Sequence, residues 1–299
     1  MLPKKKVSLF LILTLVFTSL SYMPIIRAGT ANVNGGIFVL TMMWSPGLAA
    51  ILTQLIATRS LRGLGWRLGP ARWLGIAYIL PIVYTLPVYA FTWITGLGGL
   101  LNPYVFSPLT RQYASPDLAT SITVFFLIKA TKGVIENLIF SLGEEIGWRG
   151  LLVPELAKMT SFTKTALISG VIWAAWHMPV IFLADYNSGS TPNWYAAAMF
   201  AVMIIAISFP FAWLRLKSGS LWTAVLLHTT HNIFIQGVFD RLTGHGEITP
   251  YITGEFGIGL ALTTVVVAYL FWRMQRERLV QTQPIQAEPV IKPEQSGAL

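Results

Sequence analysis

Residues 194–214 read WYAAAMFAVMIIAISFPFAWL, a stretch without a charged side chain. An α-helix rises about 1.5 Å per residue, so this stretch is about as long as the ~30 Å hydrocarbon core of a bilayer is thick. Apolar residues would occupy every side of such a helix, which in water requires complete burial. The stretch therefore predicts a membrane-spanning helix.

The composition of the whole chain also indicates a protein that lies in a lipid bilayer. Of its 299 residues, 54% are hydrophobic and 11% are charged, against about 45–50% and about 25% in soluble domains. This excess excludes an ordinary water-soluble enzyme. Apolar runs recur at residues 7–26, 36–57, 73–94, 120–143, 163–184, 194–214, 221–238 and 252–272. We expect an all-α, polytopic integral membrane protein with eight transmembrane helices.

The first apolar run admits a second interpretation. Lys4, Lys5 and Lys6 precede it and Ala28 follows it, as in a cleaved signal peptide. The run is long for the apolar region of such a peptide, which favours a helix that is retained.

The distribution of positive charge predicts the orientation of the spans. If the N-terminus is cytosolic and eight spans alternate, 16 of the 21 Lys and Arg residues fall inside: Lys4, Lys5, Lys6, Arg59, Arg62, Arg67, Arg72, Arg149, Lys158, Lys164, Arg215, Lys217, Arg273, Arg276, Arg278 and Lys292. Three fall outside: Arg27, Arg111 and Arg241. This asymmetry follows the positive-inside rule, so both termini are expected in the cytosol. We expect a multi-pass protein of the cell (plasma) membrane whose positive charge needs no nucleic-acid partner.

The first group of polar residues inside an apolar region is GEEIGWR, residues 143–149. Charged side chains within a span are costly and usually have a partner or a purpose. Glu145 and Arg149 are four residues apart, so on a helix they share a face and can form an ion pair. Glu144 is rotated by about 100° and lacks that partner. The alternative is a charged helix end at the lipid headgroups.

Two further groups lie in later spans. His177 precedes Pro179, which removes a backbone hydrogen bond and favours a bend beside the histidine. His228 and Asn232 are four residues apart and share a helix face. The alternatives are a satisfied core histidine for the first group and a polar stripe between helices for the second. His231 lies near that face, and we expect it to be structural.

With alternating spans, the three groups can lie at one depth. Glu144 is about 12 Å from Leu152, where the inner interface is expected, and His228 is about 14 Å from Gly219. His177 lies somewhat deeper, about 20 Å beyond Lys164. We therefore expect the groups to converge below the cytosolic face.

A carboxylate and imidazoles in a dry cavity suit the activation of water. The carboxylate can act as general base, while an imidazole orients the water or donates to the leaving amine. A His–Asn pair can supply two donors to a tetrahedral oxyanion. The alternative is a divalent metal such as zinc, with Glu144, His177 and His228 as ligands. No HExxH motif is present, and the metal-free arrangement uses every group once, so we expect no obligate metal or other cofactor.

The three groups together resemble the motifs of a known family. Residues 144–149 match EExxxR, His177 ends a pattern like FxxxH with Trp173 in place of Phe, and residues 228–232 match HxxxN. In this order on successive spans, they are similar to the CPBP family of intramembrane proteases. That family includes the type II CAAX prenyl endopeptidases, the ABI proteins and bacteriocin-processing membrane proteins. Trp148 also stands where many members have Phe.

The resemblance implies a role for each motif residue. Glu144 would activate water, and His177 would help to hold it. His228 and Asn232 would bind the oxyanion. Glu145 and Arg149 would form an ion pair that locks the architecture of the site.

The resemblance covers residues 120–238 and suggests a division of one integral membrane domain. Its expected parts are three helices with their loops (1–118), a CPBP-like protease core (119–240), the last transmembrane helix (241–278) and a disordered cytosolic tail (279–299).

The predicted function is an intramembrane endopeptidase that hydrolyses a peptide bond near the cytosolic membrane face. Its expected partners are the bilayer and a peptide or lipidated protein substrate, of prenylated CaaX type or leader-peptide type; the oligomeric state is open. One alternative is a non-catalytic membrane scaffold or immunity protein. Another is a proton-coupled transporter that uses Glu, Lys and His residues within spans. Lys132 and Glu136, four apart in the fourth run, are expected to form a structural pair.

Overall fold

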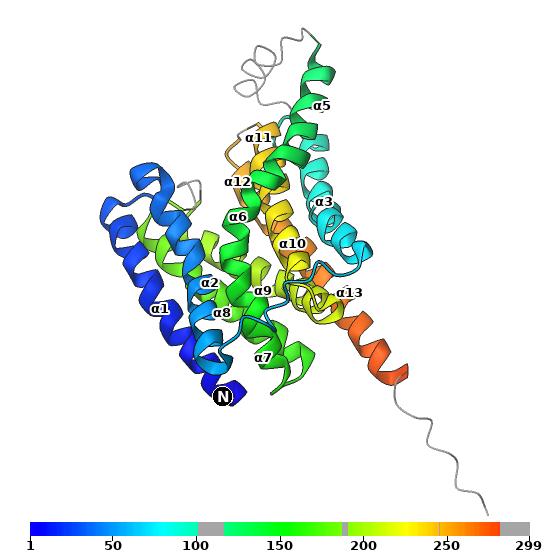
Figure 1. Ribbon diagram of the computed structural model, residues 1–299. Helices are drawn as coiled ribbons and strands as arrows, with labels where there is room; N and C mark the ends of the chain where they lie inside the picture. The colour runs from blue at the N-terminus through cyan, green and yellow to red at the C-terminus, as the bar shows by residue number, and fades with distance from the viewer. Residues whose placement is uncertain (101–116, 187–190, 245, 282–299) are drawn as a thin grey trace, which may run out of the picture.

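The computed structural model describes residues 1–100, 117–186, 191–244 and 246–281 (Figure 1). Helices occupy most of these residues, and within them β-type pairing is limited to one bridge between Leu100 and Thr243. The all-α prediction is therefore confirmed. Arg111, which the charge distribution places outside the cell, is not among the described residues, and neither are residues 282–299 of the predicted tail, which include Lys292.

Six helices coincide with six of the predicted runs and are long and apolar enough to cross a bilayer. They are α1 (Pro3–Ala28), α2 (Ile37–Thr58), α3 (Ala71–Ile94), α8 (Phe162–Leu183), α9 (Asn193–Ser218) and α13 (Ile258–Gln281). The last of these starts later than the predicted run. A short helix, α12 (Thr249–Ile252), precedes it, and Gly254 has a positive φ of 73° that ends helical geometry between the two.

The other two predicted runs are helical too, but each is interrupted by wider, π-helical turns. The fourth run comprises α5 (Leu118–Ile128), η2 (Lys129–Gly133), α6 (Val134–Glu145), η3 (Ile146–Leu152) and α7 (Val153–Ala157). The seventh comprises α10 (Trp222–Asn232), η4 (Ile233–Phe239) and α11 (Asp240–Leu242). Short π-helical segments frequently mark functional sites. Two of them, η3 and η4, directly follow the EE and HxxxN residues. The eight-helix prediction thus has a helical counterpart for every run, and the crossing of the bilayer by these two stays a prediction.

One end of the bundle gathers the basic loops, and we call it the basic end. Lys6 of α1 forms an ion pair with Glu155 of α7 at 2.7 Å. The Trp222 indole donates to the backbone carbonyl of Trp66 at 2.8 Å, which joins the start of α10 to the loop between α2 and α3. Arg215, near the end of α9, donates to the carbonyl of Gly63 in the same loop.

The opposite end is held by backbone contacts between other loops. The N–H of Asp185, after α8, donates to the carbonyl of Gly29, after α1, at 3.1 Å. The N–H of Gly244, after α11, donates to the carbonyl of Gly99, after α3, at 2.7 Å. Helix ends are therefore distributed as alternating spans require. The side of the membrane that each end faces stays a prediction.

The segment with the EE residues packs very closely on α2, as Figure 1 shows for α2 and α6. A Cβ atom added to Gly47 would lie 2.4 Å from the carbonyl oxygen of Gly143, and one added to Gly147 would lie 2.5 Å from the Cβ of Pro46. Only glycine allows these backbones to approach so closely. This contact fixes the two carboxylates of residues 144 and 145 at the interior of the bundle.

Lys132 and Glu136 form the expected pair, with 3.3 Å between Nζ and Oε1. Their side chains are 72% and 59% exposed, so the pair is a surface feature of small energetic weight. The transporter alternative required charged groups facing the interior, and Lys132 does not supply one.

Candidate active site

The structure brings the predicted site residues together inside the bundle. Glu144 is 2% exposed, His177 5% and His228 6%. These three side chains and Asn232 line one small pocket. Most of the remaining described lining is aromatic or aliphatic. The predicted convergence is thus present in the structure, while the catalytic roles stay predictions.

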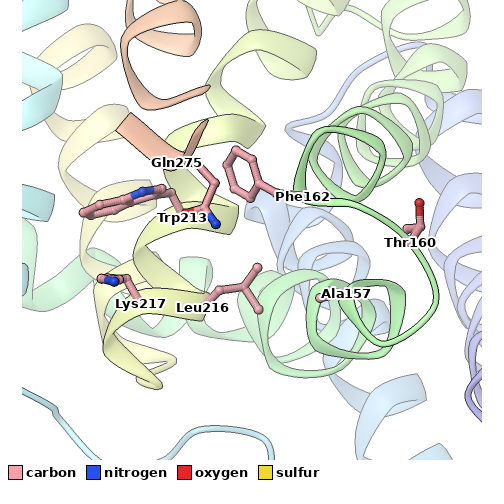
Figure 2. Close-up of a pocket in the computed structure, with 7 residues that line it drawn as sticks. All are labelled: Ala157, Thr160, Phe162, Trp213, Leu216, Lys217 and Gln275. Carbon is pink, nitrogen blue, oxygen red and sulfur yellow. The ribbon is translucent and has the colours of Figure 1, made fainter. Parts of the chain in front are cut away.

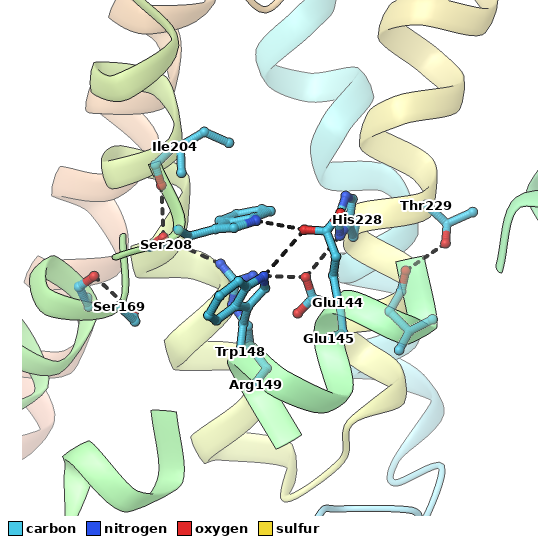
Figure 3. Close-up of polar contacts among 12 residues, drawn as sticks. Glu144, Glu145, Trp148, Arg149, Ser169, Ile204, Ser208, His228 and Thr229 are labelled. Carbon is cyan, nitrogen blue, oxygen red and sulfur yellow. Dashed lines mark hydrogen bonds and ion pairs between the residues drawn. The ribbon is translucent and has the colours of Figure 1, made fainter. Parts of the chain in front are cut away.

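Glu144 is held by two neutral donors. Its Oε2 accepts hydrogen bonds from the indole Nε1 of Trp173 at 2.8 Å and of Trp148 at 3.3 Å, the latter drawn in Figure 3. Neutral donors stabilise a carboxylate without cancelling its charge. Both tryptophans stand where the family resemblance leads one to expect Phe, which cannot donate. The sequence comparison treated these differences as aromatic replacements, and their donor role was missed.

Glu145 has the opposite environment. Its Oε1 accepts from Arg149 Nη1 at 2.8 Å and from His228 Nδ1 at 2.9 Å, so two groups share one oxygen (Figure 3). The Arg149 guanidinium is also sandwiched between the rings of Trp173 and Phe211, at 4.0 and 3.9 Å from their centroids. The predicted Glu145–Arg149 pair is therefore present. The contact with His228 was not predicted, and it ties the pair directly to the pocket.

These contacts assign the ring nitrogens of both pocket histidines. His177 Nδ1 lies 2.9 Å from the backbone carbonyl of Trp173, which can only accept, so Nδ1 carries the proton. The neutral ring then offers the Nε2 lone pair as an acceptor. His228 donates from Nδ1 to Glu145, so its Nε2 can donate only when the ring is an imidazolium paired with that carboxylate. Nε2 of His177 suits the binding of a water hydrogen, and Nε2 of protonated His228 suits the binding of an oxyanion.

His231 and Glu255 extend the polar part of the pocket. His231 is buried, as expected of a structural residue, but it also lines the pocket. Its Nε2 donates to Glu255 Oε1 at 3.0 Å, and its Nδ1 lies 2.5 Å from the Tyr84 hydroxyl. Glu255 lies between α12 and α13 and was missed, although a carboxylate near the start of an apolar run is a visible signal.

The pocket spans a range of depths. On α10, His228 is about 9 Å from the first residue, Trp222, at the basic end, whereas on α8 the pocket lies nearer the opposite end. His177 is about 23 Å along α8 from its first residue, Phe162, and about 9 Å from its last, Leu183. Tyr186, which follows α8, also lines the pocket. The depth predicted for Glu144 was too small, because the helix does not end near Leu152. It continues to Ala157 and places Glu144 about 20 Å from the basic end.

The pocket has a volume of about 50 Å³, which accommodates a few water molecules but no peptide. A larger cavity of about 310 Å³ lies at the basic end between α7, α8, α9 and α13 (Figure 2). Among the described residues that line it, Lys217 is the one titratable side chain, and none is a predicted site residue. The smaller pocket is therefore the candidate site, and a substrate must open it.

The zinc alternative needs Glu144, His177 and His228 as three ligands. Within the described parts of the chain, no three His, Asp or Glu side chains are grouped as a metal site. Glu145, a carboxylate suited to orient a ligating His228, is itself bound to Arg149. The expectation of a metal-free site stays a prediction.

Comparisons with known proteins match the part of the chain that contains the predicted site residues. The family model of Rce1-like type II CAAX prenyl endopeptidases matches residues 118–234. Over 130 residues, the chain is 26% identical to CAAX prenyl protease 2 of Methanococcus maripaludis; this match covers 42% of the chain and 45% of that protein. The chain therefore matches less than half the length of this relative. All six predicted motif residues lie within 118–234, and this segment is similar to the CPBP family of intramembrane proteases.

Proposed function

We propose that the protein is an intramembrane endopeptidase in which Glu144 activates a water molecule. The observation that carries the proposal is the pocket itself. A buried carboxylate with neutral donors, an acceptor nitrogen on His177 and the Nε2 of His228 line one space of water size. These are the groups that hydrolysis of an amide requires.

In the proposed reaction, the Glu144 carboxylate takes a proton from water while His177 Nε2 accepts the other hydrogen. The water oxygen bonds to the carbonyl carbon of the substrate. The resulting oxyanion receives hydrogen bonds from His228 Nε2–H and from the Asn232 amide. The C–N bond then breaks, and protonated Glu144 returns its proton to the leaving amine.

The contacts of Glu145 with Arg149 and His228 hold the His228 ring in position for this reaction. A carboxylate behind His228 favours the imidazolium form that can donate from both nitrogens. The aromatic rings around Arg149 hold the guanidinium in place. Glu145 and Arg149 therefore act through His228 and do not contact the substrate.

The substrate is proposed to be a peptide or lipidated protein within the bilayer. The relative from Methanococcus maripaludis is called a CAAX prenyl protease, which supports a prenylated CaaX-type substrate. A leader peptide is the second candidate.

The test compares wild type with Glu144→Gln in liposomes that contain synthetic apolar peptides. One set carries an S-farnesylated CaaX terminus and another carries internal sequences without a lipid, and mass spectrometry identifies the products. We expect cleavage by wild type and loss of turnover by orders of magnitude in the variant. Glu136→Gln, a change of an exposed glutamate on the same helix, is the matched control. Equal rates for wild type and Glu144→Gln would refute the proposal.

A further inference from the structure

Arg215 is a buried guanidinium that the proposed reaction does not use. It lies near the end of α9 and is 6% exposed. Across the residues that the structure describes, no carboxylate forms an ion pair with it. Its partners are backbone carbonyls, since Nε donates to Arg149 at 2.8 Å and Nη2 donates to Gly63 at 3.3 Å. A buried charge without a counter-ion is costly, and this cost indicates a role for the bonds that Arg215 makes.

The carbonyl of Arg149 needs an outside donor because of Pro154. In an α-helix, this carbonyl would accept from the N–H of Val153, four residues later. In η3 that N–H donates instead to the carbonyl of Trp148, five residues earlier, which is the π-helical pattern. The same pattern would pair Arg149 with residue 154, and proline has no N–H. Arg215 Nε therefore supplies the hydrogen bond that Pro154 cannot.

Pro154 also disfavours the ordinary α-helical turn at this point. A proline ring inside a helix clashes with the carbonyl four residues earlier, which here belongs to Gly150. The Arg149 residue is 1% exposed, and a buried carbonyl without a donor costs free energy comparable to a lost hydrogen bond. Pro154 and Arg215 thus act on the same turn, one by withholding a donor and the other by providing one.

The position of this carbonyl affects the site through the side chain of Arg149. The Arg149 guanidinium donates to Glu145 at 2.8 Å (Figure 3). Glu145 in turn accepts from His228 Nδ1 at 2.9 Å, and His228 is the proposed oxyanion donor. A displacement of about 1 Å in such an arrangement can lower a rate about a hundredfold. The bond from Arg215 therefore lies at the start of a chain of contacts that ends at the reacting atoms.

Resting on the proposed function, we propose that Arg215 is a positioning residue, whose bond to the Arg149 carbonyl keeps η3 in the register that aligns His228. The loop between α2 and α3 encloses the guanidinium on its other side. A Cβ atom added to Gly65 in this loop would lie 2.8 Å from Arg215 Nη2. The loop therefore restricts Arg215 to the geometry that the Arg149 carbonyl requires.

The test is a double-mutant cycle of Arg215→Met and Pro154→Ala, assayed with one cleavable peptide in liposomes. Arg215→Met removes the donor and keeps an unbranched side chain in its place. Because His228 acts on the transition state, we expect kcat to fall about tenfold to a hundredfold, with KM within about twofold of wild type. Pro154→Ala restores an N–H five residues after Arg149 and should keep wild-type activity. The double variant should recover kcat to within about fivefold of wild type, because the two changes act on one carbonyl.

Two controls separate this role from a general effect on stability. Lys217→Met changes an exposed basic residue two positions further along α9 and should leave kcat unchanged. Pro154→Ala should restore nothing in the Glu145→Gln background, because that variant lacks the ion pair itself. The melting temperature is measured for every variant, and kcat is measured well below the lowest of these temperatures.

The outcomes separate this assignment from the proposed function. A wild-type protein that cleaves no peptide refutes the proposed function, and the assignment of Arg215 falls with it. If wild type cleaves, an unchanged kcat in folded Arg215→Met, or a rise in KM alone, overturns the assignment and leaves the proposed function intact. A loss of kcat that Pro154→Ala does not restore also overturns it, because the Arg149 carbonyl is then not the group through which Arg215 acts.

The double variant decides the case in which Arg215→Met alone does not fold. A folded double variant with kcat near that of wild type supports the assignment, since a backbone N–H then replaces the guanidinium. An unfolded or inactive double variant overturns it.

Discussion

Replacing Trp173 by Phe removes one hydrogen-bond donor from Glu144 and leaves an aromatic ring in its place. Trp173 Nε1 lies 2.8 Å from Glu144 Oε2, a good distance for a bond to a charged acceptor. Loss of such a bond costs the ionised carboxylate about 1.5–3 kcal/mol. In wild type, the Arg149 guanidinium lies between the rings of Trp173 and Phe211. The variant keeps Phe211 and still has an aromatic ring at residue 173. The substitution therefore perturbs the carboxylate more than the packing.

The expected effect is a loss of activity. A difference of about 1.4 kcal/mol corresponds to a factor of ten, so kcat/KM should fall about tenfold to a hundredfold with little change in the melting temperature. Trp148→Phe removes a longer bond, 3.3 Å, and should lower kcat/KM by less than Trp173→Phe does.

The assay measures kcat/KM with one cleavable peptide, together with the melting temperature, for wild type and both variants. Trp194→Phe is the matched control because this side chain is 68% exposed and lies outside the pocket. An unchanged kcat/KM, or a loss of activity that accompanies a matching fall in the melting temperature, would show that Trp173 only packs against its neighbours. That result would refute the view that the indoles stabilise the ionised base.

Four further outcomes are expected. Glu145→Gln should lower the melting temperature as well as activity, because it leaves Arg149 buried without its counter-ion at a cost of about 3–5 kcal/mol; unchanged melting with lost activity would contradict this. A single cysteine at Tyr186 should react with an impermeant maleimide from outside the cell and one at Lys217 only after permeabilisation, which tests the orientation, since the chain has no native Cys. Burial opposes ionisation of Glu155, but hydrogen bonds from Lys6 and Lys158 outweigh it and lower its pKa. Its contribution to stability should be present above the unfolded pKa of about 4.5 and lost as the pH falls through the lower folded value, so the melting temperatures of wild type and Glu155→Gln should converge in acid. Protein shown to be metal-free by elemental analysis should retain activity; loss on chelation with recovery on stoichiometric zinc would make the zinc alternative correct.

The sequence predicts those features of the fold that depend on local pattern. Apolar runs locate the helices because a bilayer demands about 20 apolar residues from each span. The i,i+4 spacing of Glu145 and Arg149 predicts their ion pair because the spacing alone places them on one helix face. Convergence of the motif residues is also predictable, since alternating spans bring them to the interior at related depths.

Features that depend on tertiary contacts were not predictable. The π-helical turns η3 and η4 follow no sequence period, and the continuation of the fourth helix to Ala157 moved Glu144 away from the basic end. The donor role of Trp173 depends on how its indole is oriented across two helices, which composition does not reveal. Glu255 reaches the pocket from a connection far along the chain, and only the packing of α10 and α13 with α3 places it beside His231.

The adjacent residues Glu144 and Glu145 show how one helix separates a reactive carboxylate from a structural one. Their side chains leave the helix about 100° apart, so they enter different surroundings. Glu145 faces Arg149 and His228, and two cationic donors satisfy one of its oxygens. Glu144 faces the pocket, and its described donors are two neutral indoles. A carboxylate bound to a guanidinium and an imidazole serves as their counter-ion, whereas one held by neutral donors at a pocket wall can contact a water molecule there. The chemistry of the site therefore follows from the partners that each face of the helix meets.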